Sequence, residues 1–179
     1  MLTIHTLHDH TRMSTQDLLL SIEKAVNKGE TDFYVDASGQ HDIGGPLWNK
    51  EGKKLTFTVT NPGQRVGCMA LPNTEVIVKG SAPADVGWLN SGGRITVTGD
   101  AGDTAGHCAS CGSIYIGGRA GTRSGSLMKK DPLYEDPELW ILKSTGSFSF
   151  EFMGGGRAVV CGCDSQTLPS IMGDRPCVG

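Results

Sequence analysis

The stretch Glu75-Val-Ile-Val-Lys-Gly80 occurs twice more along the chain in closely similar form, as Arg94-Ile-Thr-Val-Thr-Gly99 and as Ser113-Ile-Tyr-Ile-Gly-Gly118. Each copy has aliphatic residues at alternate positions, which predicts a β-strand with one buried face. The closing glycines are 19 residues apart, since 99 − 80 and 118 − 99 both equal 19. A fixed short period is typical of a solenoid, in which each unit buries its apolar face against its neighbours.

The three copies also predict which side chains stack on one another. If each copy is one coil, equivalent residues should lie about 4.8 Å apart, the spacing of neighbouring strands. A second glycine series at 87, 106 and 125 keeps the same step and suits corners with left-handed backbone. We therefore expect valine in place of Gly99 or Gly106 to destabilise the fold strongly. The expected aliphatic columns are Val76/Ile95/Ile114 and Val78/Val97/Ile116.

Two further strands are predicted before these copies, at residues 32–36 and 55–60. Asn61 stands 19 residues before Gly80 and takes the place of a closing glycine. Asparagine tolerates left-handed backbone better than most residues, so a coil is expected there as well.

The spacing breaks after Gly118, because the next closing glycine is Gly162, 44 residues later. One period of 19 leaves 25 extra residues, and we expect this insertion at about 128–147, as a loop with a short helix or strand. Its Tyr134 and Trp140 make it a candidate contact surface; the alternative is that it packs on the flank of its own coil.

The N-terminal part should form a helix and cap, residues 1–50, followed by the coils and their insertion, residues 51–179. Ser14-Thr-Gln-Asp17 has the form of a capping box and predicts a helix that runs to about Asn27. Its apolar stripe serves either as a lid over the first coil or as a partner-binding surface. Cys177-Val-Gly179 corresponds to the middle of a coil, so we expect a partner to cover that end or the natural chain to continue.

Composition excludes several classes of partner. The chain has 179 residues, 20% of them charged, and a net charge of −3 without a basic cluster, which argues against nucleic acid. Its longest aliphatic run, Leu18-Leu-Leu20, is far too short for a membrane span, and the N-terminus lacks a signal-peptide core. We therefore expect a cytoplasmic protein whose six cysteines are reduced.

Cysteines supply the candidate metal ligands. His107-Cys108-Ala-Ser-Cys111 places two thiols at a spacing that suits zinc or redox chemistry. Cys161 and Cys163 could complete a set of four ligands if the insertion lets the two segments meet. The alternative is that these cysteines are small residues at coil corners.

Other local patterns in the sequence are weaker indications of a binding or catalytic site. His5, His8 and His10 have a spacing at which imidazoles can bind a metal, but Asp9 is the only carboxylate beside them, and a polar leader is the alternative. Residues 99–103 resemble a calcium-binding nonapeptide, yet their aspartates do not recur. No glycine-rich turn has the lysine and strand–loop–helix context of a phosphate loop, and no nucleophile and base are marked. We predict no catalytic, cofactor-binding or metal site and no cofactor.

Residues 92–106, Gly-Gly-Arg-Ile-Thr-Val-Thr-Gly-Asp-Ala-Gly-Asp-Thr-Ala-Gly, resemble the GXGXG domain. That domain forms the C-terminal part of the glutamate synthase large (alpha) subunit, and it also forms one of the subunits of formylmethanofuran dehydrogenase. Gly39-Gln-His-Asp-Ile-Gly44 and Pro62-Gly-Gln-Arg-Val-Gly67 are similar in particular to its stand-alone, glutamate-synthase-like form. The resemblance covers roughly residues 14–179. Echoes of the pattern lie at 80–87, 118–125 and 154–162.

The resemblance implies an all-β fold, a single-stranded right-handed parallel β-helix, with the N-terminal α-helix as a cap. In glutamate synthase this domain is a non-catalytic spacer that braces the amidotransferase against the synthase domain, so that ammonia passes internally. The amidotransferase nucleophile there is an N-terminal cysteine, and flavin and the iron–sulfur cluster belong to the synthase domain. We expect no such nucleophile here, because Met1 is followed by Leu2. The insertion and the abrupt end depart from the family pattern.

The resemblance therefore implies a non-catalytic structural subunit of a glutamate-synthase-like complex. Its expected partners are amidotransferase-like and flavin and iron–sulfur synthase-like proteins, with self-association through the insertion or the open end as a further option. One alternative is a scaffold of the formylmethanofuran dehydrogenase type. Another is a β-helix enzyme acting on polysaccharide, which would require export, an acidic groove and a row of exposed aromatic residues.

Overall fold

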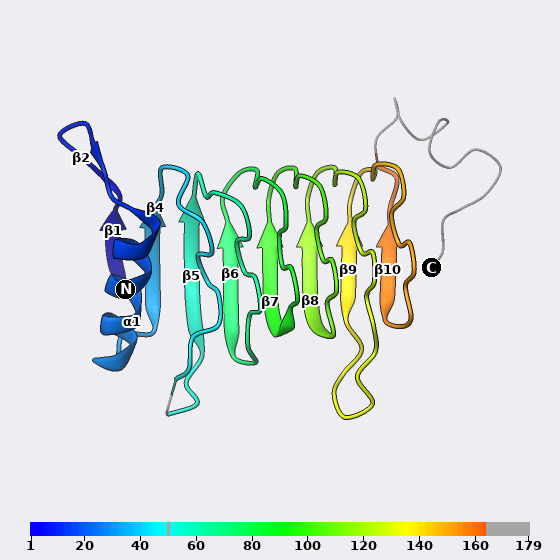
Figure 1. Ribbon diagram of the computed structural model, residues 1–179, viewed down its shortest axis with the longest axis horizontal. Coiled ribbons are helices and arrows are strands. Elements are labelled where there is room, and N and C mark those ends of the chain that lie inside the picture. Colours follow the sequence, from blue (N-terminus) through cyan, green and yellow to red (C-terminus); the bar gives the residue numbers. More distant parts are fainter. Residues whose placement is uncertain (50, 164–179) are drawn as a thin grey trace.

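The computed structural model describes residues 1–49 and 51–163. Within this part of the chain it has one α-helix and ten β-strands, arrayed along the long axis of the molecule (Figure 1). Eight strands form one parallel sheet and two form a short antiparallel hairpin. The elements are β1 (Leu2–His5), β2 (Leu7–His8), β3 (Thr11–Arg12), α1 (Thr15–Asn27), β4 (Asp32–Asp36), β5 (Leu55–Thr60), β6 (Thr74–Val78), β7 (Ser91–Val97), β8 (Cys111–Ile116), β9 (Glu138–Ile141) and β10 (Arg157–Val160).

The strands lie side by side in chain order, β1-β4-β5-β6-β7-β8-β9-β10. Parallel neighbours cannot be joined by a tight hairpin and need a connection of a dozen or more residues. From β4 onwards, each connection is a return segment that runs back in front of the sheet in the view of Figure 1. The return segments are residues 37–54, 61–73, 79–90, 98–110, 117–137 and 142–156.

The expected fold class, an all-β single-stranded right-handed parallel β-helix of period 19, is wrong. The described residues form an α/β fold with one helix and one eight-stranded parallel sheet. The physical reason lies in the backbone of the return segments, where Asp85, Gly87 and Leu89 all have positive φ. Strands require φ near −120°, so such a segment cannot continue as a strand. In the described return segments we find isolated bridges, such as Ala82 with Ala101, in place of a further sheet.

The predicted stacking of aliphatic side chains on the sheet is confirmed. Both columns have the expected register, and each step joins residues that are 19 apart. Their side chains are at most 2% exposed. The first column continues to Phe33 and Phe57, whose rings stack with centroids 4.9 Å apart, and to Leu139 at the other side. The two columns are Val76/Ile95/Ile114 and Val78/Val97/Ile116.

Strand β9 lies inside the segment in which an insertion was expected. Leu139 pairs with Ile114 of β8, 25 residues earlier, and with Ala158 of β10, 19 residues later. The 44 residues between the closing glycines therefore contain two strand-to-strand steps, and the extra length over a 19-residue step is six residues. This extra length belongs to the return segment 117–137, which projects below β9 in Figure 1.

Helix α1 has the predicted start and end. Ser14 is its N-cap, and the Ser14 Oγ accepts a hydrogen bond from the Asp17 N–H at 3.1 Å. Such a cap satisfies one of the free amides of the first turn. After Asn27, the backbone N–H of Lys28 is bonded to carbonyls of the last turn, and Gly29 has a left-handed φ of 93°.

Helix α1 covers the β1–β4 end of the sheet (Figure 1). Leu18 and Ile22 are buried in the same apolar core as Phe33, which supports the interpretation of α1 as a lid. Residues 1–13, expected as a polar leader, instead form strand β1 and the β2–β3 hairpin. Sequence reasoning missed β1 because only Leu2 and Ile4 mark its apolar alternation.

The return segments pack on the aliphatic columns through the second glycine series. A Cβ at Gly87 would lie 2.5 Å from Ile114 Cδ1, and one at Gly106 would lie 3.3 Å from Leu139 Cδ2. Both glycines also have the predicted left-handed backbone, with φ of 64° and 71°. Gly99 differs, because its φ is not left-handed; a Cβ there would lie 2.6 Å from Ser81 Oγ of the neighbouring turn.

Backbone hydrogen bonds tie successive return segments to one another. The Gly87 N–H donates to the Val66 carbonyl of the preceding return segment at 2.9 Å. The Leu89 N–H donates to the His107 carbonyl of the following one, also at 2.9 Å. The irregular segments are therefore held at the same spacing as the strands behind them.

We predict that Gly87→Ala destabilises the protein more than Gly52→Ala. Both glycines have φ of 64°, but a Cβ at Gly52 meets nothing within 4 Å. Gly52→Ala should lower the free energy of unfolding by about 1 to 2 kcal/mol through left-handed strain. Gly87→Ala should lose roughly a further 1 to 3 kcal/mol through overpacking against Ile114. Equal losses in urea denaturation would contradict the packing role of Gly87.

Candidate functional site

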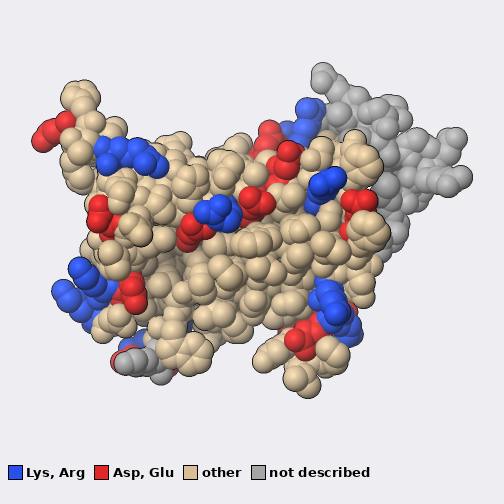
Figure 2. Space-filling view, viewed as in Figure 1, with Lys and Arg blue, Asp and Glu red and all other residues tan. Residues whose placement is uncertain are grey.

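A line of partly or fully exposed apolar side chains crosses the last five return segments, one from each. Its members hold equivalent positions and all have left-handed backbone. Each stands two residues after another left-handed residue that packs on the sheet, as Leu89 does after Gly87. Figure 2 shows a band of charged side chains across the middle of this face and further charged clusters at its lower left and lower right, with mostly uncharged surface between these clusters. We call the set the apolar line; it comprises Met69, Leu89, Cys108, Leu127 and Phe152.

The backbone sets the spacing of the apolar line. The Met69 N–H donates to the carbonyl of Trp88 at 2.8 Å, and the Cys108 N–H donates to the carbonyl of Ser126 at 2.9 Å. The Leu127 N–H likewise donates at 2.9 Å to the next return segment. The first four members are thereby fixed to the following return segment, so neighbouring side chains should be roughly one strand spacing, about 4.8 Å, apart.

Exposure of the apolar line is high for large hydrophobic side chains. Met69 is 37% exposed, Leu127 is 45% exposed and Phe152 is 77% exposed. A contiguous exposed apolar surface of this kind is typical of an interaction site.

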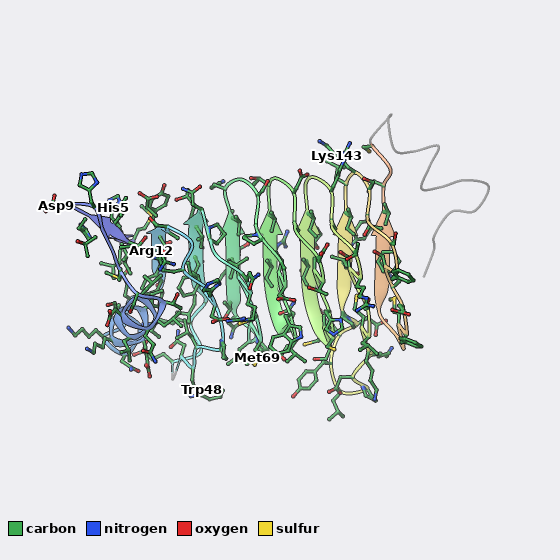
Figure 3. All side chains as sticks on the ribbon, turned by 45° about the horizontal axis from the view of Figure 1, so that its top comes forward. His5, Asp9, Arg12, Trp48, Met69 and Lys143 are labelled. Carbon is green, nitrogen blue, oxygen red and sulfur yellow. The ribbon has the colours of Figure 1, made fainter. Side chains whose placement is uncertain are left out.

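Two projecting loops lie beside the apolar line. Trp48 is 76% exposed and, like Met69, lies toward the lower edge of the molecule in the view of Figure 3. Leu133 and Tyr134 are 86% and 60% exposed, in the loop below β9. Of the two aromatic residues expected to form a contact surface, Tyr134 is thus available, whereas Trp140 is half-buried on the sheet and donates its Nε1–H to Glu138.

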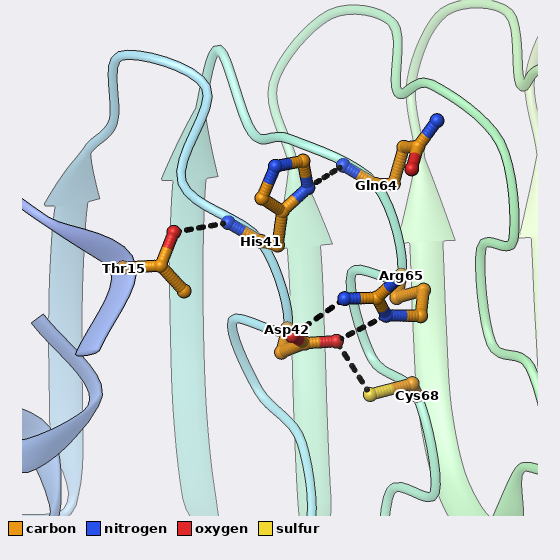
Figure 4. Close-up of polar contacts among 6 residues, drawn as sticks. All are labelled: Thr15, His41, Asp42, Gln64, Arg65 and Cys68. Atoms are coloured by element: carbon orange, nitrogen blue, oxygen red, sulfur yellow. Dashed lines mark hydrogen bonds and ion pairs between the residues drawn. The ribbon is translucent and has the colours of Figure 1, made fainter.

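The two motifs at 39–44 and 62–67 lie on neighbouring return segments and meet through side chains (Figure 4). Asp42 accepts two hydrogen bonds from Arg65, from Nε at 2.7 Å and from Nη2 at 3.0 Å. The Cys68 thiol points at the same carboxylate at 3.4 Å. The His41 Nδ1 accepts from the Gln64 N–H at 2.9 Å.

These contacts set the protonation of the cluster. The hydrogen bonds from Arg65 hold the pKa of Asp42 below its ordinary value of 3.8, against the opposing effect of burial. Burial, with the Asp42 charge beside it, raises the pKa of the Cys68 thiol to about 12. Cys68 is therefore a protonated, unreactive thiol at neutral pH, and Asp42 is an ionised structural carboxylate.

The structure spreads the candidate metal ligands over several elements. Cys108 belongs to the apolar line and Cys111 begins β8, whereas Cys161 and Cys163 follow β10, with β9 between the two strands. Burial raises the pKa of both Cys108 and Cys111. The Nδ1 of His107 is buried without a hydrogen-bond partner in the described structure. No group of three or more His, Cys, Asp or Glu residues within residues 1–49 and 51–163 is placed to hold a metal.

The N-terminal histidines are also separated by the fold. His5 lies on β1, where its Nδ1 is 3.1 Å from Asp36 Oδ2, whereas His8 lies on β2 and His10 in the hairpin turn. Cys177 lies outside the described residues.

The apolar line was not predicted from the sequence. Its members differ in type, and their spacing departs from 19 at both ends of the line. The available signal was position: Leu89, Cys108 and Leu127 each stand two residues after a member of the second glycine series. Side-chain exposure at those positions depends on left-handed backbone, which residue type alone does not reveal.

Comparison with known proteins gives one family match. The model of the GXGXG motif family matches residues 48–173. No curated protein and no solved structure matches the chain significantly. The resemblance to formylmethanofuran dehydrogenase is not confirmed by these comparisons. Within the described residues, α1 falls short of the length and apolarity needed to cross a membrane, and it is the one helix there.

We predict that Asp42→Asn lowers the free energy of unfolding by about 1 kcal/mol at pH 7, because a partly exposed bidentate pair with Arg65 is lost. The folded-state pKa of Asp42 is lowered, so its contribution is present above pH 3.8 and disappears as the pH falls below that value. Denaturation of both proteins from pH 7 to pH 3 measures the difference. Glu51→Gln, at an exposed pair with Lys53, should change little. A difference in the free energy of unfolding between wild type and Asp42→Asn that is as large at pH 3 as at pH 7 would refute the ion-pair explanation.

We predict that, among the five cysteines within the described residues, Cys161 and Cys163 are the first to react with a thiol reagent at pH 8, because both are exposed. Cys68 should react only after unfolding, because it is buried and its pKa is raised to about 12. Mass spectrometry of peptides from timed samples assigns each modified residue. Early labelling of Cys68 in the native protein would contradict the burial of this thiol.

Proposed function

Because the chain belongs to the GXGXG motif family, we propose that it is a non-catalytic structural subunit or domain of a glutamate-synthase-like assembly. The family match is consistent with the GXGXG domain of glutamate synthase and suggests a glutamate-synthase-like role. In our proposal the chain braces an amidotransferase-like protein against a flavin and iron–sulfur synthase-like protein. The flavin and the cluster belong to the second of these partners.

The observation that carries the proposal is the apolar line. Exposed side chains such as Leu127 and Phe152 leave apolar surface in water unless a partner covers them. Burying one such side chain fully contributes about 1.5 to 3 kcal/mol to binding before association costs. Hydrogen bonds already fix the backbone of the first four members, so little backbone ordering entropy opposes docking.

The polar cluster beside the line supports a structural rather than a chemical role. The two oxygens of Asp42 are engaged by Arg65, and the Cys68 thiol is held protonated by burial. The hydrogen bonds from Arg65 lower the pKa of Asp42, which makes this carboxylate a weak base, and a thiol nucleophile needs a thiolate. These residues instead link two neighbouring return segments.

We predict that the double variant Met69→Glu/Leu127→Glu weakens binding to a purified amidotransferase-like or synthase-like partner from the same organism by at least about 10-fold, because two charges enter an apolar contact. Titration calorimetry measures the affinity, and native mass spectrometry of the complex detects the bound flavin. Leu7→Glu, on the hairpin and 54% exposed in the wild type, is the matched control and should bind normally.

Failure of the wild-type protein to bind either partner would refute the proposed function. Equal binding by the double variant and the control would refute the role of the apolar line. Sedimentation of the chain without a partner detects self-association through the loop below β9 or through the sheet end. It thereby distinguishes self-association from binding to a partner.

A further inference from the structure

The turn that follows β10 holds two cysteines that neither the core nor the proposed function uses. Cys161 and Cys163 stand on either side of Gly162. Both are exposed free thiols, whereas Gly162 is buried. The positions 19 residues earlier, after β9, hold Leu142 and Ser144, so this place in the fold does not require cysteine.

Backbone hydrogen bonds define the conformation of this turn. The Gly162 N–H donates to the carbonyl of Lys143 at 2.9 Å. The Cys163 N–H donates to the carbonyl of Leu142, on the same neighbouring turn, at 3.0 Å. Successive N–H groups of an extended strand point to opposite sides, so the backbone at Gly162 is not extended. Its φ of 67° places it in the left-handed helical region.

This conformation brings the two cysteines within reach of each other. In helical backbone of either hand, Cα atoms two residues apart are separated by about 5.4 Å, because each residue rises 1.5 Å on a radius of roughly 2.3 Å. A disulfide requires a Cα separation of about 4.4 to 6.8 Å. Both side chains also reach solvent, so the thiols of Cys161 and Cys163 can meet outside the core.

Metal binding is the other use of two neighbouring thiols. Zinc takes four protein ligands in a structural site and three in a catalytic site. Within residues 1–49 and 51–163, no group of three or more His, Cys, Asp or Glu residues is placed to hold a metal. The described part of the chain therefore favours redox chemistry over metal binding at Cys161 and Cys163.

We propose that Cys161 and Cys163 form a redox-active dithiol that exchanges with small disulfides of the glutathione type. One cysteine loses its proton and its thiolate attacks a sulfur of oxidised glutathione, so that the S–S bond breaks and one glutathione leaves as a thiolate. The second cysteine then loses its proton, attacks the protein sulfur of the mixed disulfide and displaces the other glutathione. The two glutathione thiolates take up two protons. The cysteines are thereby oxidised to one disulfide, and oxidised glutathione is reduced to two thiols.

The short loop makes the second step fast and the disulfide reversible. Both thiols belong to one turn, so the second attack is intramolecular and has a high effective concentration. Closing a loop of three residues removes little entropy from the unfolded chain, so the disulfide adds little to stability. An exposed disulfide is also open to attack by reducing thiols. The pair should therefore follow the ratio of oxidised to reduced glutathione.

The test equilibrates the full-length protein with buffers of oxidised and reduced glutathione at pH 7, then quenches with acid and alkylates the remaining thiols. Cleavage after Arg157 and before Asp164 releases residues 158–163, which contain Cys161 and Cys163 and no other cysteine. Mass spectrometry should show this peptide changing from two alkyl groups to an internal disulfide. The mixed disulfide should stay below about a tenth of the total, because ring closure is intramolecular. Excess reduced glutathione should restore both thiols.

Three variants show whether the two cysteines act as a pair. Cys163→Ser should retain one glutathione on Cys161, and Cys161→Ser should retain one on Cys163, because the second thiol is missing. Cys177→Ser is the control and should give the wild-type titration. Cys161 and Cys163 are exposed, so both of their serine variants should keep the melting temperature of the wild type, measured by circular dichroism.

Several results would overturn the inference. One is a wild-type peptide 158–163 that keeps both thiols at the highest ratio of oxidised to reduced glutathione, or that accumulates as the mixed disulfide. Another is a disulfide that joins Cys161 or Cys163 to Cys177 or to a second copy of the chain, detected by peptide mapping and non-reducing gels. The titration uses no partner protein, so these results would leave the proposed function intact.

Discussion

The structure depends on one close contact, that between the return segments and the aliphatic face of the sheet. At Gly87 there is no space for even one methyl group in front of Ile114. Because no side chain separates the two layers, the carbonyls and amides of successive return segments can pair at strand spacing. The sheet behind and the irregular segments in front therefore share one register, and the stacked columns between them, with Phe33 and Phe57 near one end, fill the core.

The same contact determines which side chains reach the surface. Left-handed residues alternate along each return segment, so side chains that do not enter the core are directed outward at fixed places. Asp42 and Arg65 meet because they hold equivalent places on neighbouring segments. The apolar line arises in the same way, two residues after the left-handed positions that pack on the sheet. The residues for which we propose a function therefore hold positions that repeat along the molecule because the packing of the core repeats.

Local signals in the sequence predicted α1 and the strands from β4 to β8 well, because capping residues and apolar alternation act over short distances. They failed for strands whose formation depends on pairing with distant segments. β1 has too few apolar residues to be recognised alone, and β9 was assigned to an insertion. The fold class was wrong because left-handed backbone at residues such as Thr104 and Cys108 cannot be inferred from residue type. The candidate site was missed for the same reason. The contact between Asp42 and Cys68 depends on stacking of segments 26 residues apart.

The direction of the hydrogen bonds has a mechanical consequence. Bonds between strands and bonds between return segments all run along the long axis, on opposite sides of the core (Figure 1). Bending the molecule in one direction stretches the bonds on one side, and bending it the other way stretches those on the opposite side. The protein should behave as a short girder that keeps the separation of its two ends nearly constant. Two proteins attached at different points along it would be held at a fixed distance, without a hinge between them.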